Sequence, residues 1–173
     1  MAAAAATFAL VQLRVRLDGP AASESTGSAI ARGQPAPAVT GTTLDGAAFD
    51  LSSLRGRPVL LNFWGPSCIP CRDEFPLFTA KLAEHADTGL AIVGVLMFDA
   101  PAPALDFIAE YHASWQTVDD PSGAIRAAYR VAARPQTYFI DRDGILRSIQ
   151  VGQLTDAEFE RQYALISAAA AGT

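Results

Sequence analysis

The fold is decided by the stretch Val59-Leu60-Leu61-Asn62-Phe63-Trp64-Gly65-Pro66-Ser67-Cys68-Ile69-Pro70-Cys71. Its first six residues read as a continuous apolar run, which is typical of a β-strand covered on both faces. A long helix is expected next, over residues 67–86, because Phe75, Phe78 and Leu82 recur at spacings of three and four. The two cysteines therefore lie where a buried strand ends and a helix begins. In an α/β sheet this junction is the usual place for a reactive site.

Strands and helices alternate along the rest of the chain. A hairpin is expected over residues 38–51, and Pro76 should kink the long helix. Further strands are expected at 91–97, 117–118, 136–140 and 145–151, and helices at 52–55, 102–112, 122–129 and 155–167, the last capped by Thr155. This order predicts an α/β domain with a central mixed β-sheet flanked by helices and an added N-terminal β-hairpin.

Composition narrows the functional classes. The chain has 173 residues, 50% of them apolar and 18% charged, which suits one domain with a sizeable core. Its net charge of −5 and the lack of a basic stripe argue against a nucleic-acid partner. Two cysteines are too few for a disulfide framework, and a structural zinc site needs two more ligands.

The two ends of the chain differ in composition from its centre. Residues 1–17 are apolar and Ala-rich, and we expect either the remnant of a membrane anchor or a frayed helix; no complete transmembrane helix is present in the sequence. Residues 18–34 read as a flexible linker, 35–167 as the folded domain and 168–173 as a disordered tail of small residues.

The C-x-x-C pair suits dithiol chemistry. Cys68 falls at a helix N-terminus, where free N–H groups and the helix dipole lower the pKa of a thiol, and Arg72 could add to that effect. Cys71 lies one turn later, close enough to attack a mixed disulfide on Cys68. Glu74 follows after three more residues, and a carboxylate at that depth would have a raised pKa and could carry the proton of Cys71.

Each of these interpretations has a simpler alternative. A lone C-x-x-C can be half of a metal site, but the only histidines, His85 and His112, are predicted on helices far along the chain, so no metal is expected. A glutamate on a helix is most often simply solvated.

Five segments together resemble a known family. They are residues 33–37, 43–46, 51–56, 61–76 and 129–144, which follow one another in the family's order. The chain resembles the TlpA/ResA-like (DsbE-type) thiol-disulfide oxidoreductases, thioredoxin-fold members of the alkyl hydroperoxide reductase/thiol-specific antioxidant superfamily.

The resemblance implies roles for further residues. Pro135 should be preceded by a cis peptide bond and face Cys68, and the backbone of Arg134 should meet an extended substrate. Trp64 is placed with these substrate-binding residues, as a packing floor under the dithiol. Glu74 matches the family's glutamate, and Asn62 stands where thioredoxin itself has a buried aspartate. A turn proline before a strand is the simpler interpretation of Pro135.

The chain departs from the family at three positions. Ser67 replaces the usual Trp before the first cysteine, Arg134 replaces a small or apolar residue before the proline, and Ala133 replaces a glycine. A cation at Arg134 would stabilise the Cys68 thiolate and make the protein more oxidising. The pair Ile69-Pro70, in contrast, resembles reducing members.

The sequence thus predicts a thiol-disulfide oxidoreductase without a cofactor. By resemblance we expect it to reduce protein disulfides, such as those of apocytochrome c, at the periplasmic face of a bacterial membrane, with a membrane thiol donor and an N-terminal tether. The alternatives are a disulfide-donating oxidase, a copper chaperone and a non-catalytic binding module. A chaperone of this fold needs C-x-x-x-C and a ligand histidine; a thiol peroxidase would need Pro at Leu61 and Thr at Gly65.

Overall fold

A computed structural model describes residues 30–168. The expected anchor at 1–17, residues 18–29 of the expected linker and residues 169–173 of the tail lie outside the described residues. Residues 33 and 34 belong to the domain rather than to a linker, because Gly33 N donates to Leu146 O (2.7 Å) and Gln34 O accepts from Leu146 N (2.9 Å).

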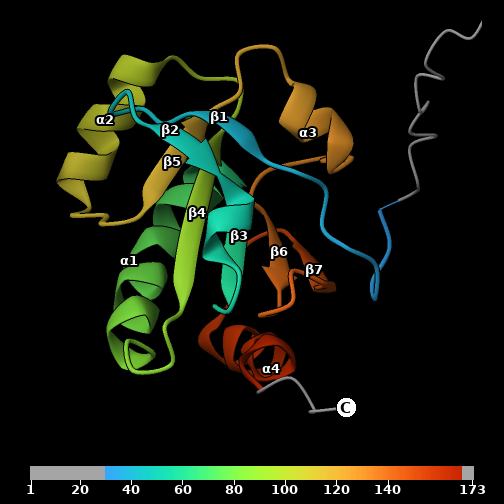
Figure 1. Ribbon diagram of the computed structural model, residues 1–173. Coiled ribbons are helices and arrows are strands. Elements are labelled where there is room, and N and C mark those ends of the chain that lie inside the picture. Colours follow the sequence, from blue (N-terminus) through green and yellow to red (C-terminus); the bar gives the residue numbers. More distant parts are fainter. Residues whose placement is uncertain (1–29, 169–173) are drawn as a thin grey trace, which may run out of the picture.

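The structure confirms an α/β domain built on a mixed sheet (Figure 1). Its elements are β1 (Thr40–Thr42), β2 (Ala48–Asp50), η1 (Leu51–Leu54), β3 (Val59–Trp64), α1 (Ile69–Glu84), β4 (Ala91–Leu96), α2 (Pro101–Glu110), β5 (Gln116–Asp119), α3 (Ala124–Ala128), β6 (Gln136–Ile140), β7 (Leu146–Val151) and α4 (Asp156–Ser167). The sheet has the order β5-β4-β3-β6-β7, and β1 and β2 form the predicted N-terminal hairpin.

The register of β3 brings three distant segments to one edge of the sheet. β3 runs parallel to β4, with Trp64 opposite Leu96, and antiparallel to β6, with Phe63 opposite Gln136. The residues after β3, those after β4 and those before β6 therefore meet at the edge where the cysteines lie.

Side chains of β3 alternate between two cores. Leu60 and Trp64 pack with α1, α2 and α4 on one face, while Leu61 and Phe63 pack with α3 and the N-terminal hairpin on the other. All six residues of β3 are buried, as the apolar run predicts. Among residues 30–168 no helix is long and apolar enough to cross a bilayer.

The expected helix boundaries need small corrections. The long helix begins at Ile69 with Cys68 as its N-cap, and Pro76 lies inside it as predicted. The N-terminus of α4 is confirmed: Thr155 and Glu158 form a reciprocal capping box.

Candidate active site

The two cysteines form a disulfide at the start of α1. Their sulfurs are bonded, and the backbone N–H of Cys71 also points at Cys68 Sγ, 3.3 Å away. Cys68 keeps 7% of its surface exposed, whereas Cys71 is fully buried. A substrate thiol or disulfide can therefore reach Cys68 only, and the helix N-terminus supplies N–H groups that favour its thiolate.

Trp64 forms the floor of this site. Its ring lies 4.6 Å from that of Phe75 and 5.3 Å from that of Phe107, in the core cluster that also contains both cysteines. Trp64 is 0% exposed. Its placement among the substrate-binding residues is therefore corrected: it supports the dithiol from below and has no surface for a substrate to touch.

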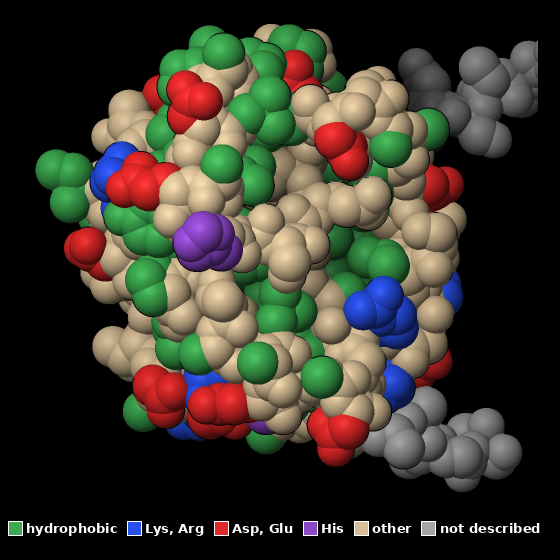
Figure 2. Space-filling model, turned by 90° about the vertical axis from the view of Figure 1, so that its left-hand side faces the viewer, with side chains coloured by type: hydrophobic (Ala, Val, Ile, Leu, Met, Phe, Trp, Pro, Cys, Tyr) green, Lys and Arg blue, Asp and Glu red, His purple; other side chains and the backbone are tan. Residues whose placement is uncertain are grey.

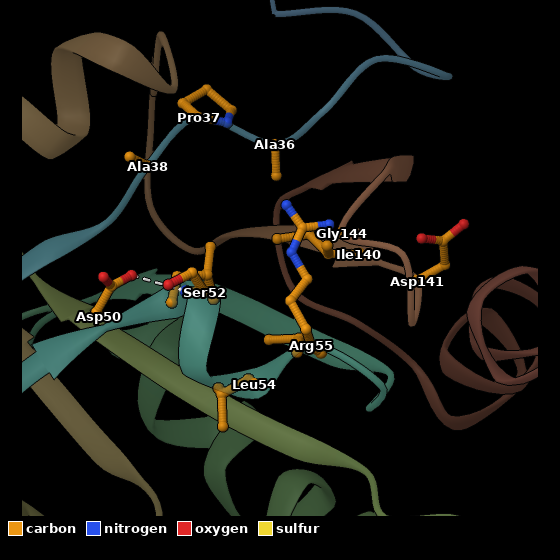
Figure 3. A pocket seen from close by; sticks show the side chains of 12 residues that line it. Ala36, Pro37, Ala38, Asp50, Ser52, Leu54, Arg55, Ile140, Asp141 and Gly144 are labelled. Atoms are coloured by element: carbon orange, nitrogen blue, oxygen red, sulfur yellow. Dashed lines mark hydrogen bonds between the residues drawn. The ribbon is translucent and has the colours of Figure 1, made fainter.

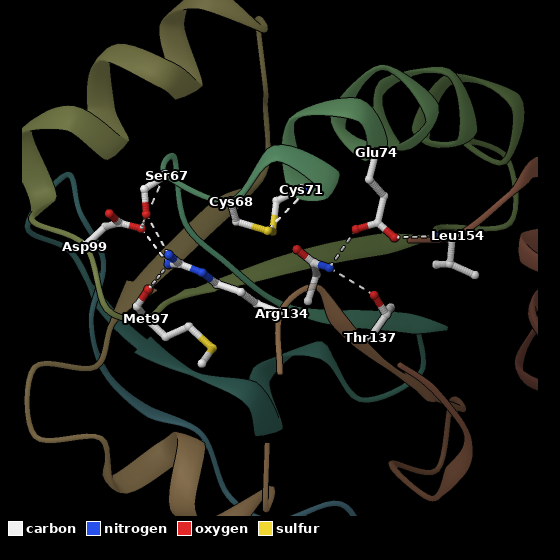
Figure 4. The surroundings of a disulfide bond; sticks show 10 residues. Ser67, Cys68, Cys71, Glu74, Met97, Asp99, Arg134, Thr137 and Leu154 are labelled. Atoms are coloured by element: carbon white, nitrogen blue, oxygen red, sulfur yellow. Dashed lines mark hydrogen bonds and ion pairs between the residues drawn. A yellow bond between two sulfur atoms is a disulfide. The ribbon is translucent and has the colours of Figure 1, made fainter. Parts of the chain in front are cut away.

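Glu74 is buried one turn beyond Cys71 and is not a solvated surface group. Its side chain accepts a hydrogen bond from the Leu154 backbone N–H (2.9 Å; Figure 4) and another from Asn62 Nδ2 (3.2 Å). Burial raises the pKa of Glu74 to about 8, against the opposing effect of these two hydrogen bonds. A carboxyl group with such a pKa can accept and release a proton near neutral pH.

Asn62 links Glu74 to the strand that follows the proline. Its Nδ2 also donates to Thr137 Oγ1 at 2.9 Å. Glu74 is thus held by one residue from β3, and by the backbone just before α4.

The bond between Arg134 and Pro135 is cis, as the resemblance implies. Pro135 is buried and its carbonyl accepts from Gly152 N (2.9 Å), while β6 begins one residue later at Gln136. Arg134 and Pro135 therefore stand at the end of a sheet strand, next to the edge that carries the dithiol.

The side chain of Arg134 runs past the dithiol to a carboxylate that sequence reasoning missed. Nη1 donates to Asp99 Oδ2 (2.5 Å) and to Met97 O (2.5 Å), and Nη2 donates to Ser67 Oγ (2.6 Å). Figure 4 shows these groups gathered on the side of Cys68 away from Glu74. Asp99 lies three residues after β4. Because the carboxyl ends of parallel strands lie at the same edge of a sheet, its position after a predicted strand is the feature of the sequence that could have indicated it.

A second group of potential metal ligands lies at the other end of α1. Glu84, His85 and Glu160 come together there, but Lys81 Nζ bonds Glu84 (2.7 Å) and Glu160 (2.7 Å). Lys81 occupies the position between these carboxylates and pairs with Asp156 as well, so the group is an ion-pair network that joins α1 to α4.

A hollow at the opposite end of the sheet is unrelated to the dithiol. It lies where β3 begins and β6 ends, with Pro37, Arg55, Asp141 and Gly144 around it (Figure 3). Its walls are mainly apolar, and its lining contains no cysteine or histidine.

On the face drawn in Figure 2, Lys and Arg side chains are scattered among acidic and apolar ones.

An accessible thiol at a helix N-terminus, a buried partner thiol and a buried carboxyl group define a dithiol–disulfide oxidoreductase site. The chain matches the AhpC/TSA family over residues 32–149 and belongs to that family.

Relatives and solved structures agree with this class. The chain is 36% identical over 136 residues to "Thioredoxin-like protein YneN" of Bacillus subtilis, covering 77% of this chain and 79% of that one. It is 35% identical over 134 residues to "Thiol:disulfide interchange protein DsbE" of Pseudomonas fluorescens, covering 76% and 73%. The protein is a thiol-disulfide oxidoreductase of the TlpA/ResA/DsbE type.

The fold is likewise that of solved thioredoxin-like proteins. A putative DsbE from Chlorobium tepidum superposes with a TM-score of 0.74 at 28% identity, covering 80% of this chain and 99% of that one. A secreted Mycobacterium tuberculosis disulfide oxidoreductase, described as homologous to E. coli DsbE, gives 0.66 at 29% identity, covering 73% and 94%.

Proposed function

We propose that this oxidoreductase reduces disulfides of proteins at the outer face of a bacterial membrane, with apocytochrome c before haem attachment as an example. The observation that carries the proposal is the buried pair of Cys71 and Glu74 behind the accessible Cys68. A reductant must release its substrate quickly from the mixed disulfide, and a carboxylate close to the resolving thiol serves that step.

The reaction begins with reduced protein. The Cys68 thiolate attacks one sulfur of the substrate disulfide, and the other substrate sulfur leaves as a thiolate. Cys71 then gives its proton to the Glu74 carboxylate and attacks Cys68 Sγ. The second substrate sulfur leaves, and two electrons have passed from the Cys68–Cys71 pair to the substrate. The disulfide in the structure is the product state of this half-reaction.

Substrate contact falls on the cis-proline segment. The backbone of Arg134, just before β6, would pair with an extended substrate chain whose disulfide faces Cys68. Main-chain pairing accepts many side chains, which suits a protein that acts on unfolded polypeptides.

The proposed location and electron donor rest on similarity. The related Mycobacterium tuberculosis oxidoreductase is described as secreted. We propose an extracytoplasmic position for this chain, a membrane thiol donor that reduces Cys68–Cys71 after each turnover, and a tether within residues 1–17.

The midpoint potential tests the direction of the reaction. The protein is equilibrated with defined thiol/disulfide buffers, alkylated and weighed by mass spectrometry. A two-electron transition near or below about −220 mV is expected for a reductant. A midpoint near about −120 mV would instead identify a disulfide donor, and the absence of a reversible transition would leave a binding module.

A further inference from the structure

We propose that Asp99 keeps this dithiol reducing, because it holds and neutralises the Arg134 guanidinium beside Cys68. The inference deepens the proposed function, since it concerns what sets the direction of the same redox pair. Asp99 is a positioning residue in this scheme: it acts on the cysteines through Arg134.

Arg134, Asp99 and Ser67 form a closed polar cluster, which we call the Arg134 clasp. Ser67 Oγ accepts from Arg134 Nη2 and donates to Asp99 Oδ2 at 3.0 Å, while Arg134 Nη1 pairs with the same oxygen. The clasp ties the segment before Pro135 to the residue directly before Cys68.

The two charged groups of the clasp are largely shielded from solvent, whereas Ser67 is exposed. The side chain of Arg134 is 18% exposed and that of Asp99 is 15% exposed. Charges in such a setting are screened much less than surface charges, so an unbalanced one would act on a neighbouring sulfur.

The surrounding backbone is adapted to the clasp. A Cβ on Gly65 would stand 2.2 Å from Asp99 Oδ2 and 2.3 Å from Arg134 Nη1, so the clasp fills space that only glycine leaves open. Phe98 has a φ of 64°, a conformation unfavourable for a bulky side chain, between the two residues whose oxygens bind Arg134 Nη1. The turn is thus bent so that the Met97 carbonyl and the Asp99 carboxylate both meet the guanidinium.

The electrostatic consequence has a definite sign. A cation beside Cys68 favours its thiolate and hence the reduced form of the protein, which makes the disulfide more oxidising. With Asp99 in place the pair carries no net charge and this effect is cancelled. The helix N-terminus remains, and the dithiol keeps the potential of a reductant.

The test is a double-mutant cycle read by the equilibrium constant with glutathione. Asp99→Asn removes one negative charge and retains a side-chain oxygen for Arg134. It should favour the reduced form roughly tenfold, which corresponds to a midpoint potential higher by about 30 mV. Arg134→Ala leaves the carboxylate unbalanced and should shift the equilibrium in the opposite direction. The double variant should lie within about twofold of the unmodified protein.

Asp119→Asn is the matched control. Asp99 and Asp119 both line a surface hollow between the ends of β4 and β5, but within residues 30–168 the Asp119 side chain makes no hydrogen bond to Arg134. This variant should leave the equilibrium unchanged, and thermal unfolding of all variants reports whether they fold.

Several outcomes would overturn the inference. They are an unchanged equilibrium in Asp99→Asn, an equal shift in Asp119→Asn, and shifts of the same sign in the two single variants. If Asp99→Asn does not fold, Arg134→Ala provides the test alone. A midpoint potential equal to or higher than that of the unmodified protein would refute the role of the pair. These results differ from failure of the proposed function, which would appear as an oxidising midpoint, or no reversible transition, in the unmodified protein.

Discussion

The backbone N–H of Leu154 donates a hydrogen bond to Glu74 Oε1 across 80 positions of sequence. Leu154 directly precedes Thr155, the N-cap of α4, so the start of that helix contacts the carboxyl group that we propose accepts the Cys71 proton. Proton affinity in the active site therefore depends on how α4 is docked.

Substitution Glu74→Gln should change how stability varies with pH. The pKa of Glu74 is raised from 4.5 to about 8 in the folded protein, so the folded state holds a proton that the unfolded chain releases. Stability from this group is greatest below the unfolded pKa and is lost as the pH rises toward 8. Urea unfolding of the oxidised proteins measures this effect. Between pH 5 and 8 the unfolding free energy of Glu74→Gln should rise relative to that of the unmodified protein, by on the order of a few kcal/mol. Parallel curves would contradict the raised pKa.

The same substitution should slow one chemical step. In the proposed mechanism the carboxylate accepts the Cys71 proton, so without it the mixed disulfide should persist and its resolution should fall about 100-fold near neutral pH. Rapid acid quench followed by mass spectrometry separates the mixed disulfide from the products. The first attack by Cys68 serves as the internal control, and an equal loss in both steps would argue for general damage instead.

Single cysteine variants should behave unequally. Cys71→Ser should trap a substrate on Cys68, whereas Cys68→Ser should form almost no adduct, because Cys71 is fully buried. Each variant is incubated with a disulfide-containing peptide, and non-reducing electrophoresis measures the amount of mixed-disulfide adduct. Comparable adducts from the two variants would refute the assignment of Cys68 as the attacking thiol.

Thr155→Ala tests the link through α4. Loss of the cap should cost about 1 kcal/mol of unfolding free energy. The Leu154 hydrogen bond lowers the pKa of Glu74, so a loosened helix start should move that pKa upward. The pH dependence of the rate of mixed-disulfide resolution should then shift to higher pH. Thr79→Ala removes a comparable hydroxyl from the exposed face of α1 and should leave the pH profile unchanged; an equal displacement in both variants would rule out a specific role for α4.

The elements around the dithiol could be predicted because their signals are local. The apolar run before Trp64 indicates a buried strand, and the C-x-x-C spacing with Glu74 three residues later places three groups along one helix. The capping box at Thr155 is equally local, since both of its partners lie within one turn.

The Arg134 clasp could not be predicted, because it depends on register. Arg134 and Asp99 are 35 residues apart and meet only because β4 and β6 both flank β3. From sequence, Arg134 reads as an unbalanced cation next to the thiol. For a similar reason the sequence predicts a domain start at residue 35, although Gly33 and Gln34 already belong to it: they offer no apolar side chain and join the domain through backbone bonds to Leu146.

The unequal burial of the two sulfurs also bears on oxidative damage. A peroxide that reaches the reduced protein meets Cys68 first and converts it to a sulfenic acid. Cys71, which is buried and bonded to Cys68 in this structure, is placed to condense with that acid, which would release water and re-form the disulfide. The buried cysteine would thus protect the exposed one from irreversible oxidation.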